Sequence, residues 1–224
     1  MTKDRKLIVQ DIGLTAYKSA WQYQKLMVSR RKCDDTLDDA LILTEHFPVY
    51  TLGASAQKRF IHFDVADPSY QVFRTERGGE VTYNCPGQLV GYPILNLYYH
   101  CKDLHWYLRQ LEEVVLRTLA HYGLVGQRIK GLTGVWVDGH KLAAIGIKVS
   151  RWITMHGVAL NVCPDLSGFG YITPCGIADR PVGSMTQFLP KISVAEVKPV
   201  FVKCFAEVFG RITTESESPF IDSD

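Results

Sequence analysis

Arg77-Gly-Gly-Glu-Val-Thr-Tyr-Asn-Cys-Pro-Gly-Gln88 is a run of glycine and small polar residues near the middle of a 224-residue chain. Strand-like segments at 72–74 and 89–97 flank it, and 79–83 has the same character. Glycine adopts turn conformations at little steric cost and lets a backbone or ligand approach closely. The run therefore predicts short strands joined by glycine loops, with room for a ligand beside them.

Two further segments add reactive side chains to this glycine framework. Thr133-Gly-Val-Trp-Val-Asp-Gly-His-Lys-Leu-Ala-Ala-Ile-Gly146 carries Lys141 just after an Asp-Gly turn, and Thr173-Pro-Cys-Gly-Ile177 carries Cys175 on a loop. Thiols react as thiolates, so a reactive cysteine needs a positive neighbour to lower a reference pKa of about 8.5. Lys141 is the candidate neighbour. A lysine at a strand end also reaches water readily, so the residues alone leave the pairing open.

Composition predicts a single globular domain over residues 1–224. The hydrophobic fraction is 46%, and the net charge is only +2, with no basic tract longer than Arg30-Arg31-Lys32, which we expect to be a solvated face. This charge excludes a nucleic-acid-binding class. No stretch of about 18 apolar residues indicates a membrane span.

The cysteine pattern favours a reducing, cytoplasmic environment. The N-terminal residues are charged without a following apolar core, so they do not predict a secretory signal. None of the six cysteines forms a C-x-x-C pair, which argues against a disulfide framework and against a zinc site. We expect no bound metal.

Hydrophobic periodicity predicts a mixed α/β (α+β) fold with one largely antiparallel sheet flanked by helices. Helices are expected at 15–31, capped by Thr15, at 103–122, capped by Asp103, and near the C-terminus, where Ser193 and Glu196 form a capping box. Pro199 predicts a kink or a later start of that last helix. Strands are expected at 7–12, 39–45, 135–137, 142–149 and 152–162, with a mobile tail after about residue 215.

Three other features have competing interpretations. His156 is an alternative base, although a single histidine on a strand is more often a structural group. The Arg77-Gly78-Gly79 segment binds an anion or simply forms a turn. It lacks the nucleotide-binding glycine pattern, so ATP and NAD receive little weight. Cys85, beside Pro86, is interpreted as a small residue that fills a tight turn.

In combination, these segments resemble the lipoyl(octanoyl) transferases over nearly the whole chain. The matching motifs are Arg77-Gly-Gly-x-x-Thr-Tyr-x-x-Pro-Gly-Gln88, Thr133-Gly-Val-Trp136, Lys141, Ala144-Ile-Gly146, His156-Gly-Val-Ala-Leu-Asn161 and Pro174-Cys-Gly176. The resemblance implies the fold of the biotin and lipoate protein ligases. It also implies transfer of an octanoyl group from octanoyl acyl carrier protein to a lysine of a lipoyl domain, the first step of endogenous protein lipoylation, without a cofactor.

The resemblance also assigns residues and partners. Cys175 would carry the octanoyl group as a thioester, Lys141 would lower the pKa of that thiol, and His156 is a supporting candidate. The acceptors would be lipoyl domains of 2-oxoacid dehydrogenase complexes and the glycine cleavage H protein. We expect the enzyme to be a monomer without a nucleic-acid or membrane partner. The implied substrate-binding residues are Arg77, Gly78, Gly79, Glu80, Val81, Thr82, Tyr83, Asn84, Ala144, Ile145, Gly146, Gly157, Val158 and Ala159.

One departure from the family pattern concerns the chemistry. The family usually reads Tyr-His-Gly-Pro-Gly-Gln, whereas this chain has Asn84 and Cys85 in place of the histidine and glycine. Asparagine forms hydrogen bonds but does not titrate. Two alternatives therefore remain: an ATP-dependent lipoate or biotin ligase, which would not need Cys175, and a non-catalytic relative that binds an acyl carrier or lipoyl domain.

Overall fold

The computed structural model describes residues 6–174 and 180–215, and within them three α-helices and ten strands. In chain order these are β1 (Lys6–Thr15), α1 (Tyr17–Cys33), β2 (Asp39–His46), β3 (Val49–Leu52), β4 (Val72–Arg74), β5 (Val81–Asn84), β6 (Gln88–Ile94), α2 (Leu104–His121), β7 (Val135–Val137), β8 (His140–Ser150), β9 (Ile153–Asn161), α3 (Val194–Phe209) and β10 (Ile212–Glu215). The predicted strands and helices are all present, and β10 is an addition.

The strands form two sheets, so the prediction of one sheet is wrong. The larger sheet has seven strands in the order β10-β1-β2-β6-β9-β8-β7, and it is antiparallel except where β1 pairs with β10 and β2. The strands β4-β3-β5 form a separate three-stranded sheet. The chain passes from the small sheet to the large one in the turn between β5 and β6, where the N–H of Cys85 donates to the side chain of Gln88.

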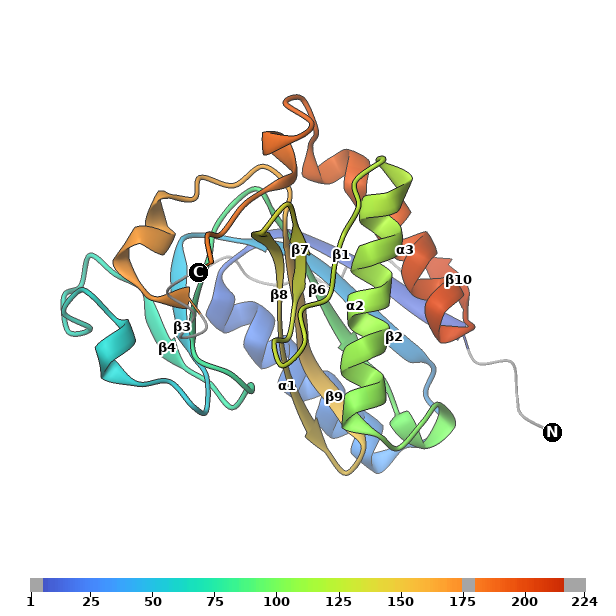
Figure 1. The fold of residues 1–224 in the computed structure, drawn as a ribbon. Helices are drawn as coiled ribbons and strands as arrows, with labels where there is room; N and C mark the ends of the chain where they lie inside the picture. Colours follow the sequence, from blue (N-terminus) through green and yellow to red (C-terminus); the bar gives the residue numbers. More distant parts are fainter. Residues whose placement is uncertain (1–5, 175–179, 216–224) are drawn as a thin grey trace.

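Helices cover both faces of the large sheet (Figure 1). The helices α2 and α3 lie side by side on one face, over a core that includes Leu111, Phe201 and Leu160. On the other face, α1 packs through Ala20 and Val28. The small sheet lies at one end of that second face and has its own aromatic core. The mixed fold with sheets flanked by helices is therefore confirmed.

Helix ends follow the predicted caps in two of three cases. The Asp103 carboxylate accepts hydrogen bonds from the N–H groups of His105 and Trp106, and Ser193 and Glu196 form the predicted capping box. The Thr15 cap is wrong, because its hydroxyl donates to the carbonyl of Ile12 and α1 starts without a side-chain cap. A later start caused by Pro199 is also wrong, because α3 begins at Val194 and includes that proline.

Two surface predictions need correction. Apolar residues spaced four and three apart predict a buried stripe on α2 that starts at Leu104, but Leu104 is 45% exposed, because the buried face is rotated toward Tyr107 and Val114. Arg31 was expected on a solvated face but is only 3% exposed, and its guanidinium pairs with Asp39 at 3.3 Å and bonds the carbonyl of Leu37.

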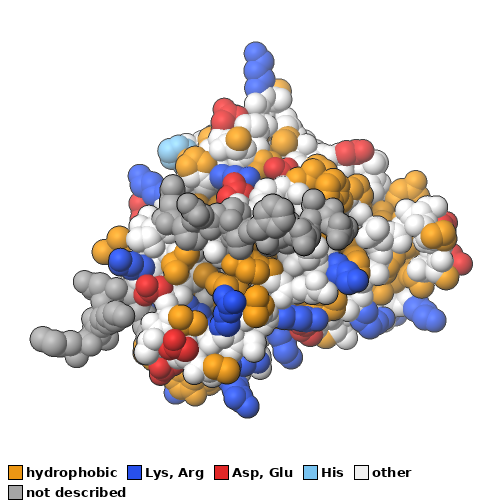
Figure 2. All heavy atoms as spheres, turned by 180° about the vertical axis from the view of Figure 1, so that it is seen from behind, with side chains coloured by type: hydrophobic (Ala, Val, Ile, Leu, Met, Phe, Trp, Pro, Cys, Tyr) orange, Lys and Arg blue, Asp and Glu red, His pale blue; other side chains and the backbone are white. Residues whose placement is uncertain are grey.

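The described residues contain no helix with the length and apolarity of a bilayer span. On the face seen in Figure 2, lysine and arginine side chains are spread among hydrophobic and acidic ones.

Candidate active site

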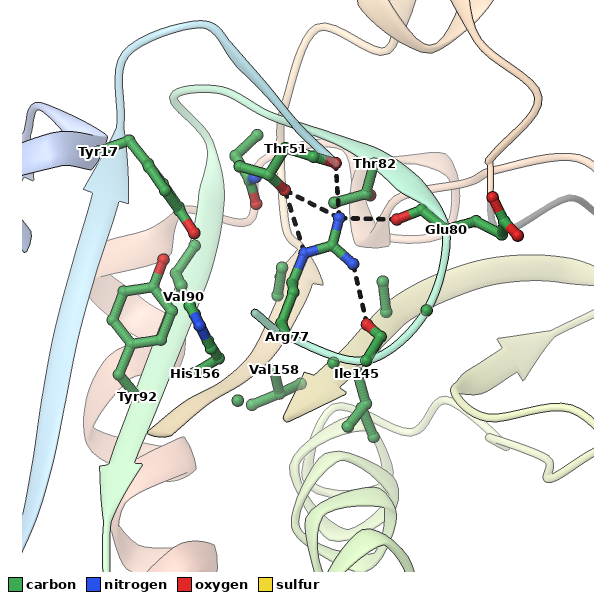
Figure 3. Close-up of a pocket in the computed structure, with 17 residues that line it drawn as sticks. Tyr17, Thr51, Arg77, Glu80, Thr82, Val90, Tyr92, Ile145, His156 and Val158 are labelled. Atoms are coloured by element: carbon green, nitrogen blue, oxygen red, sulfur yellow. Dashed lines mark hydrogen bonds between the residues drawn. The ribbon is translucent and has the colours of Figure 1, made fainter. Parts of the chain in front are cut away.

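A central cavity lies between the loop that precedes β5 and the β8–β9 hairpin (Figure 3). Every predicted substrate-binding residue except Val81 and Tyr83 lines it, together with His156. Side chains alternate along β5, so Thr82 and Asn84 face this cavity, whereas Val81 and Tyr83 pack into the core of the small sheet. The fold therefore brings three motifs that are distant in sequence to one cavity.

Sequence reasoning missed four residues of this cavity: Tyr17, Thr51, Val90 and Tyr92. In Figure 3, Tyr17 and Tyr92 lie side by side at the end near His156. Burial raises the pKa of the Tyr17 hydroxyl to about 12, so it is protonated at neutral pH. These residues belong to ordinary apolar patterns on α1, β3 and β6, and only the packing of those elements brings them to the cavity.

Arg77 holds the loop beside the cavity in place. Its guanidinium donates to the carbonyl oxygen of Thr51 at 2.6 Å, to the carbonyl of Glu80 at 2.8 Å and to the carbonyl of Gly78 at 3.1 Å (Figure 3). A planar fork with five donors suits such a set of carbonyl acceptors. Of the two interpretations of this segment, the contacts favour a structural turn.

Glycines in the cavity wall allow close backbone approach. A Cβ on Gly157 would lie 2.2 Å from the carbonyl oxygen of Gly91 on the neighbouring strand, so close strand packing requires glycine there. A Cβ on Gly146 would lie 3.0 Å from the carbonyl oxygen of Gly78 and 3.2 Å from Cδ of Arg77. The second glycine therefore lets the Arg77 loop lie over β8 and roof the cavity.

His156 has an unusual conformation for a strand residue. Its φ is +59°, in the left-handed region, and its N–H donates to Oε1 of the buried Gln24 at 2.9 Å. The imidazole is 2% exposed, and within the described residues its Nε2 has no hydrogen-bond partner. Burial, together with the positive Arg77 and Lys25, lowers its pKa to about 4, so the ring is neutral at pH 7.

Lys141 lines a second, smaller cavity that adjoins the first. The lysine is 7% exposed, and its ammonium lies 5.2 Å from the ring centre of Trp136. Thr82, Ala144 and Ala159 line both cavities, and Pro174 lines the Lys141 cavity. Backbone hydrogen bonds to Pro181 and Gly183 hold residue 141 in place. The interpretation of Lys141 as a strand-end lysine that extends into water is therefore wrong.

The predicted nucleophile lies outside the described residues, although its neighbour Pro174 lies inside. Cys85 is buried, and burial raises the pKa of its thiol to about 11, which agrees with a packing role. The Asn84 side chain faces the central cavity and makes no hydrogen bond within residues 6–174 and 180–215. In the same ranges, no group of three His, Cys, Asp or Glu side chains is arranged to hold a metal ion.

Comparison with known proteins identifies the family. Residues 16–206 match the lipoyl protein ligase A/B catalytic domain. The chain belongs to this family. Among the lipoyl protein ligase A/B proteins, it is 60% identical over 205 residues to an octanoyltransferase of Nostoc punctiforme, covering 92% of this chain and 89% of that protein. It is also 60% identical over 197 residues to an octanoyltransferase of Synechocystis, with 88% and 87% covered. The resemblance to the lipoyl(octanoyl) transferases is thereby confirmed.

Solved structures of lipoate and biotin protein ligases share the fold at low sequence identity. Lipoate-protein ligase A bound with ATP superimposes with a TM-score of 0.72 at 16% identity, covering 97% of this chain and 90% of that chain. The bipartite lipoate protein ligase of Thermoplasma acidophilum has a TM-score of 0.72 at 15% identity, with 96% and 88% covered. A biotin protein ligase of Aquifex aeolicus, at 13% identity, has a TM-score of 0.52, with 92% and 70% covered. The predicted ligase-type fold is confirmed.

Proposed function

We propose that this chain is an octanoyltransferase that moves an octanoyl group from an acyl carrier protein to a lysine of a lipoyl domain. The 60% identity to octanoyltransferases over most of the chain supports the activity. The observation that supports the mechanism is that the central cavity and the Lys141 cavity share a wall. Thr82, Ala144 and Ala159 connect a small-residue cavity to the one that holds Lys141 and Pro174.

In this proposal, the central cavity holds the acyl chain and the Lys141 cavity holds the reacting atoms. The Arg77 loop forms one wall of the central cavity, and Val90, Ala144 and Ala159 contribute apolar side chains to it. Burial of an acyl chain contributes about 0.8 kcal/mol per methylene. The carbonyl end would then lie near Pro174, and therefore near Cys175, which directly follows it in the sequence.

The first half-reaction forms an enzyme thioester. The Cys175 thiolate attacks the carbonyl carbon of the donor thioester, a new C–S bond forms, and the donor thiol leaves with the proton that Cys175 gave up. The Lys141 ammonium would stabilise the Cys175 thiolate, and each pKa unit of such stabilisation needs about 1.4 kcal/mol. Exchange between thioesters is nearly neutral in energy, so this step requires no ATP.

The second half-reaction transfers the acyl group to nitrogen. The amine of the target lysine attacks the enzyme thioester, an amide bond forms, and the Cys175 thiolate leaves. The proton lost by the amine needs an acceptor, and Lys141 in its neutral form would take this role. Two steps through a covalent intermediate let two large protein substrates use one site in turn.

Intact-protein mass spectrometry tests the proposal. The protein is mixed with octanoyl acyl carrier protein in the absence of ATP, and Cys175→Ser is treated in parallel. An octanoyl adduct that hydroxylamine removes, present on the wild type and absent from Cys175→Ser, is the expected result. An adduct that neutral hydroxylamine removes from both proteins would exclude Cys175 as the carrier, whereas a hydroxylamine-resistant adduct on Cys175→Ser alone would be an oxyester of the new serine. A transfer that appears only after ATP and octanoate are added would instead assign a ligase activity.

A further inference from the structure

The central cavity follows the β8–β9 hairpin and ends at His156. Its connection to the Lys141 cavity lies where Ala144 pairs with Ala159, and its other end lies where Ile147 pairs with His156. These two pairs are three residues apart along the strands, or about 10 Å at 3.3 Å per residue. An extended eight-carbon acyl chain spans roughly 9 Å between its first and last carbon, given C–C bonds of about 1.5 Å.

A third cavity, here called the outer hollow, continues along the same hairpin beyond His156. It begins where Lys148 pairs with Met155, extends to the Ser150–Ile153 pair, and has a volume of about 270 Å³. Its floor is apolar, because Met155 and Ile153 belong to the core beneath α1. The remaining residues that line it are Lys25, Val28, Ser29, Lys32 and Glu76.

His156 stands between the central cavity and the outer hollow. Strict alternation along β9 would place its side chain on the face of Val158 and Thr154. Its positive φ departs from strand geometry, and the ring lines the central cavity, beside Tyr17 and Tyr92 (Figure 3). Its Nε2 lies 3.9 Å from Oε1 of Glu76, which lines the outer hollow. The imidazole and this carboxylate therefore separate the two spaces.

The conformation of His156 is maintained by its surroundings. A non-glycine residue keeps a positive φ only where neighbouring contacts require it. The hydrogen bond from its N–H to Gln24 supplies such a contact, since Gln24 is fully buried on α1. The imidazole is therefore placed at the end of the cavity by its backbone and is 2% exposed.

We propose that His156 sets the acyl-chain length of this enzyme as the end wall of the central cavity. This inference rests on the proposed function, because it takes the central cavity as the acyl site. A chain of eight carbons fills the space up to the imidazole, and a longer chain must displace the ring. Without the ring, the central cavity opens into the apolar floor of the outer hollow, which accepts the additional carbons.

The variant His156→Gly tests this proposal without straining the backbone, because glycine readily adopts the φ of +59° found there. Equal amounts of octanoyl, decanoyl and dodecanoyl acyl carrier protein compete for each protein, and intact-protein mass spectrometry reads the adduct ratio. One methylene is worth about 10-fold or more in a fitted apolar site, so we expect the dodecanoyl-to-octanoyl ratio to rise at least 10-fold. A general loss of active protein leaves this ratio unchanged.

Arg151→Gly is the matched control. Arg151 lies in the turn of the same hairpin, has a φ of +52°, is exposed and lines none of the three cavities. Its dodecanoyl-to-octanoyl ratio should equal that of the wild type. If His156→Gly does not fold, His156→Asn gives the same test, because asparagine also tolerates positive φ and is shorter than histidine.

A binding measurement separates failure of this inference from failure of the proposed function. Calorimetric titration with free octanoate and dodecanoate requires no turnover. If the wild type forms no adduct with any thioester, the proposed function fails, and the ratio of the two affinities still tests His156. An unchanged length preference in the folded glycine or asparagine variant, by adduct ratio or by affinity ratio, overturns the role of His156.

Discussion

Nε2 of Gln88 donates a hydrogen bond to Oδ1 of Asn161 over 2.8 Å, inside the protein. Gln88 ends the signature run 77–88, and Asn161 ends the motif 156–161 on β9. Nδ2 of Asn161 in turn donates to the carbonyl of Gly183 at 2.8 Å, and the N–H of Gly183 donates to the carbonyl of Lys141 at 3.0 Å. Hydrogen bonds therefore connect two separate motifs, through Gly183, to the backbone of Lys141.

Removing the Gln88 side chain should destabilise the fold. In Gln88→Ala, the N–H of Cys85 and Oδ1 of Asn161 both lose their partner in a buried position. Each unsatisfied buried group costs about 1–3 kcal/mol, so with two such groups the free energy of unfolding should fall by roughly 2–6 kcal/mol. Urea unfolding measures this loss. Gln22→Ala, at an exposed position on α1, is the matched control, and an equal effect in both variants would contradict the network.

Lys141→Met should slow adduct formation while keeping the fold. Methionine fills similar space beside Trp136 but carries no charge, so the Cys175 thiolate loses its stabilising neighbour. We expect the rate at pH 7 to fall about 100-fold or more, within the range typical of acid–base residues. Raising the pH toward 9 should recover part of the rate, because more thiol ionises without help.

Lys203→Met is the control for this substitution, since Lys203 is exposed on α3, on the other face of the sheet. Reactions with octanoyl acyl carrier protein are quenched at set times, and intact-protein mass spectrometry measures the rate of adduct formation in each variant. Equal rates in both variants would remove Lys141 from the mechanism.

Arg77→Lys should loosen the roof of the central cavity. One ammonium cannot reproduce the fork that bonds the carbonyls of Thr51, Gly78 and Glu80. We expect the free energy of unfolding to fall by about 1–3 kcal/mol and the affinity for octanoate to fall with it. Arg74→Lys, exposed on β4, should change neither quantity. If Arg77→Lys binds octanoate as tightly as the wild type, the loop over the central cavity does not depend on the hydrogen bonds of the guanidinium.

Stability should decrease below neutral pH because His46 is buried in its neutral form. Its Nδ1 lies 2.8 Å from the carbonyl of Thr15 and must donate, so Nε2 accepts from the Tyr92 hydroxyl at 2.7 Å. Burial lowers the pKa of His46 from 6.5 to about 4. The unfolded chain therefore binds a proton that the folded chain does not, and stability present above pH 6.5 is lost as the pH falls toward 4.

At pH 5.5 this linkage amounts to about 1 kcal/mol for His46. His46→Gln should be less stable than the wild type at pH 7.5 and should lose less stability between pH 7.5 and 5.5. Chemical unfolding at the two pH values gives both differences. An equal loss in the two proteins would assign the pH dependence to other groups, such as His156, whose pKa is also lowered to about 4.

Asn84→His should change the rate of adduct formation little. If Lys141 performs the proton transfer, a titratable residue at position 84 is not needed. A proton-moving histidine would instead raise the rate by about 100-fold or more. Single-turnover kinetics distinguish these outcomes, and a gain of that size would show that Lys141 alone does not perform the transfer.

Local sequence signals predicted most elements of this fold. Asp103 caps α2, Ser193 and Glu196 cap α3, and Asp138-Gly139 forms the hairpin turn with φ values of +46° and +80°. These signals succeed because a cap or tight turn depends on neighbouring residues only. The predicted cap at Thr15 is absent, because the Thr15 hydroxyl donates to the carbonyl of Ile12 instead.

By itself, the sequence determined the element types, the family through its motifs, and most residues of the central cavity. Tertiary structure decided the features that depend on long-range contacts. These are the separate β4-β3-β5 sheet, the position of Tyr17 and Tyr92 at the central cavity, and the position of Lys141 beside Trp136. It also decided the left-handed conformation of His156, which depends on a hydrogen bond to Gln24, 132 residues away in the chain. Local propensity carries no information about such partners, because they meet only when the elements pack.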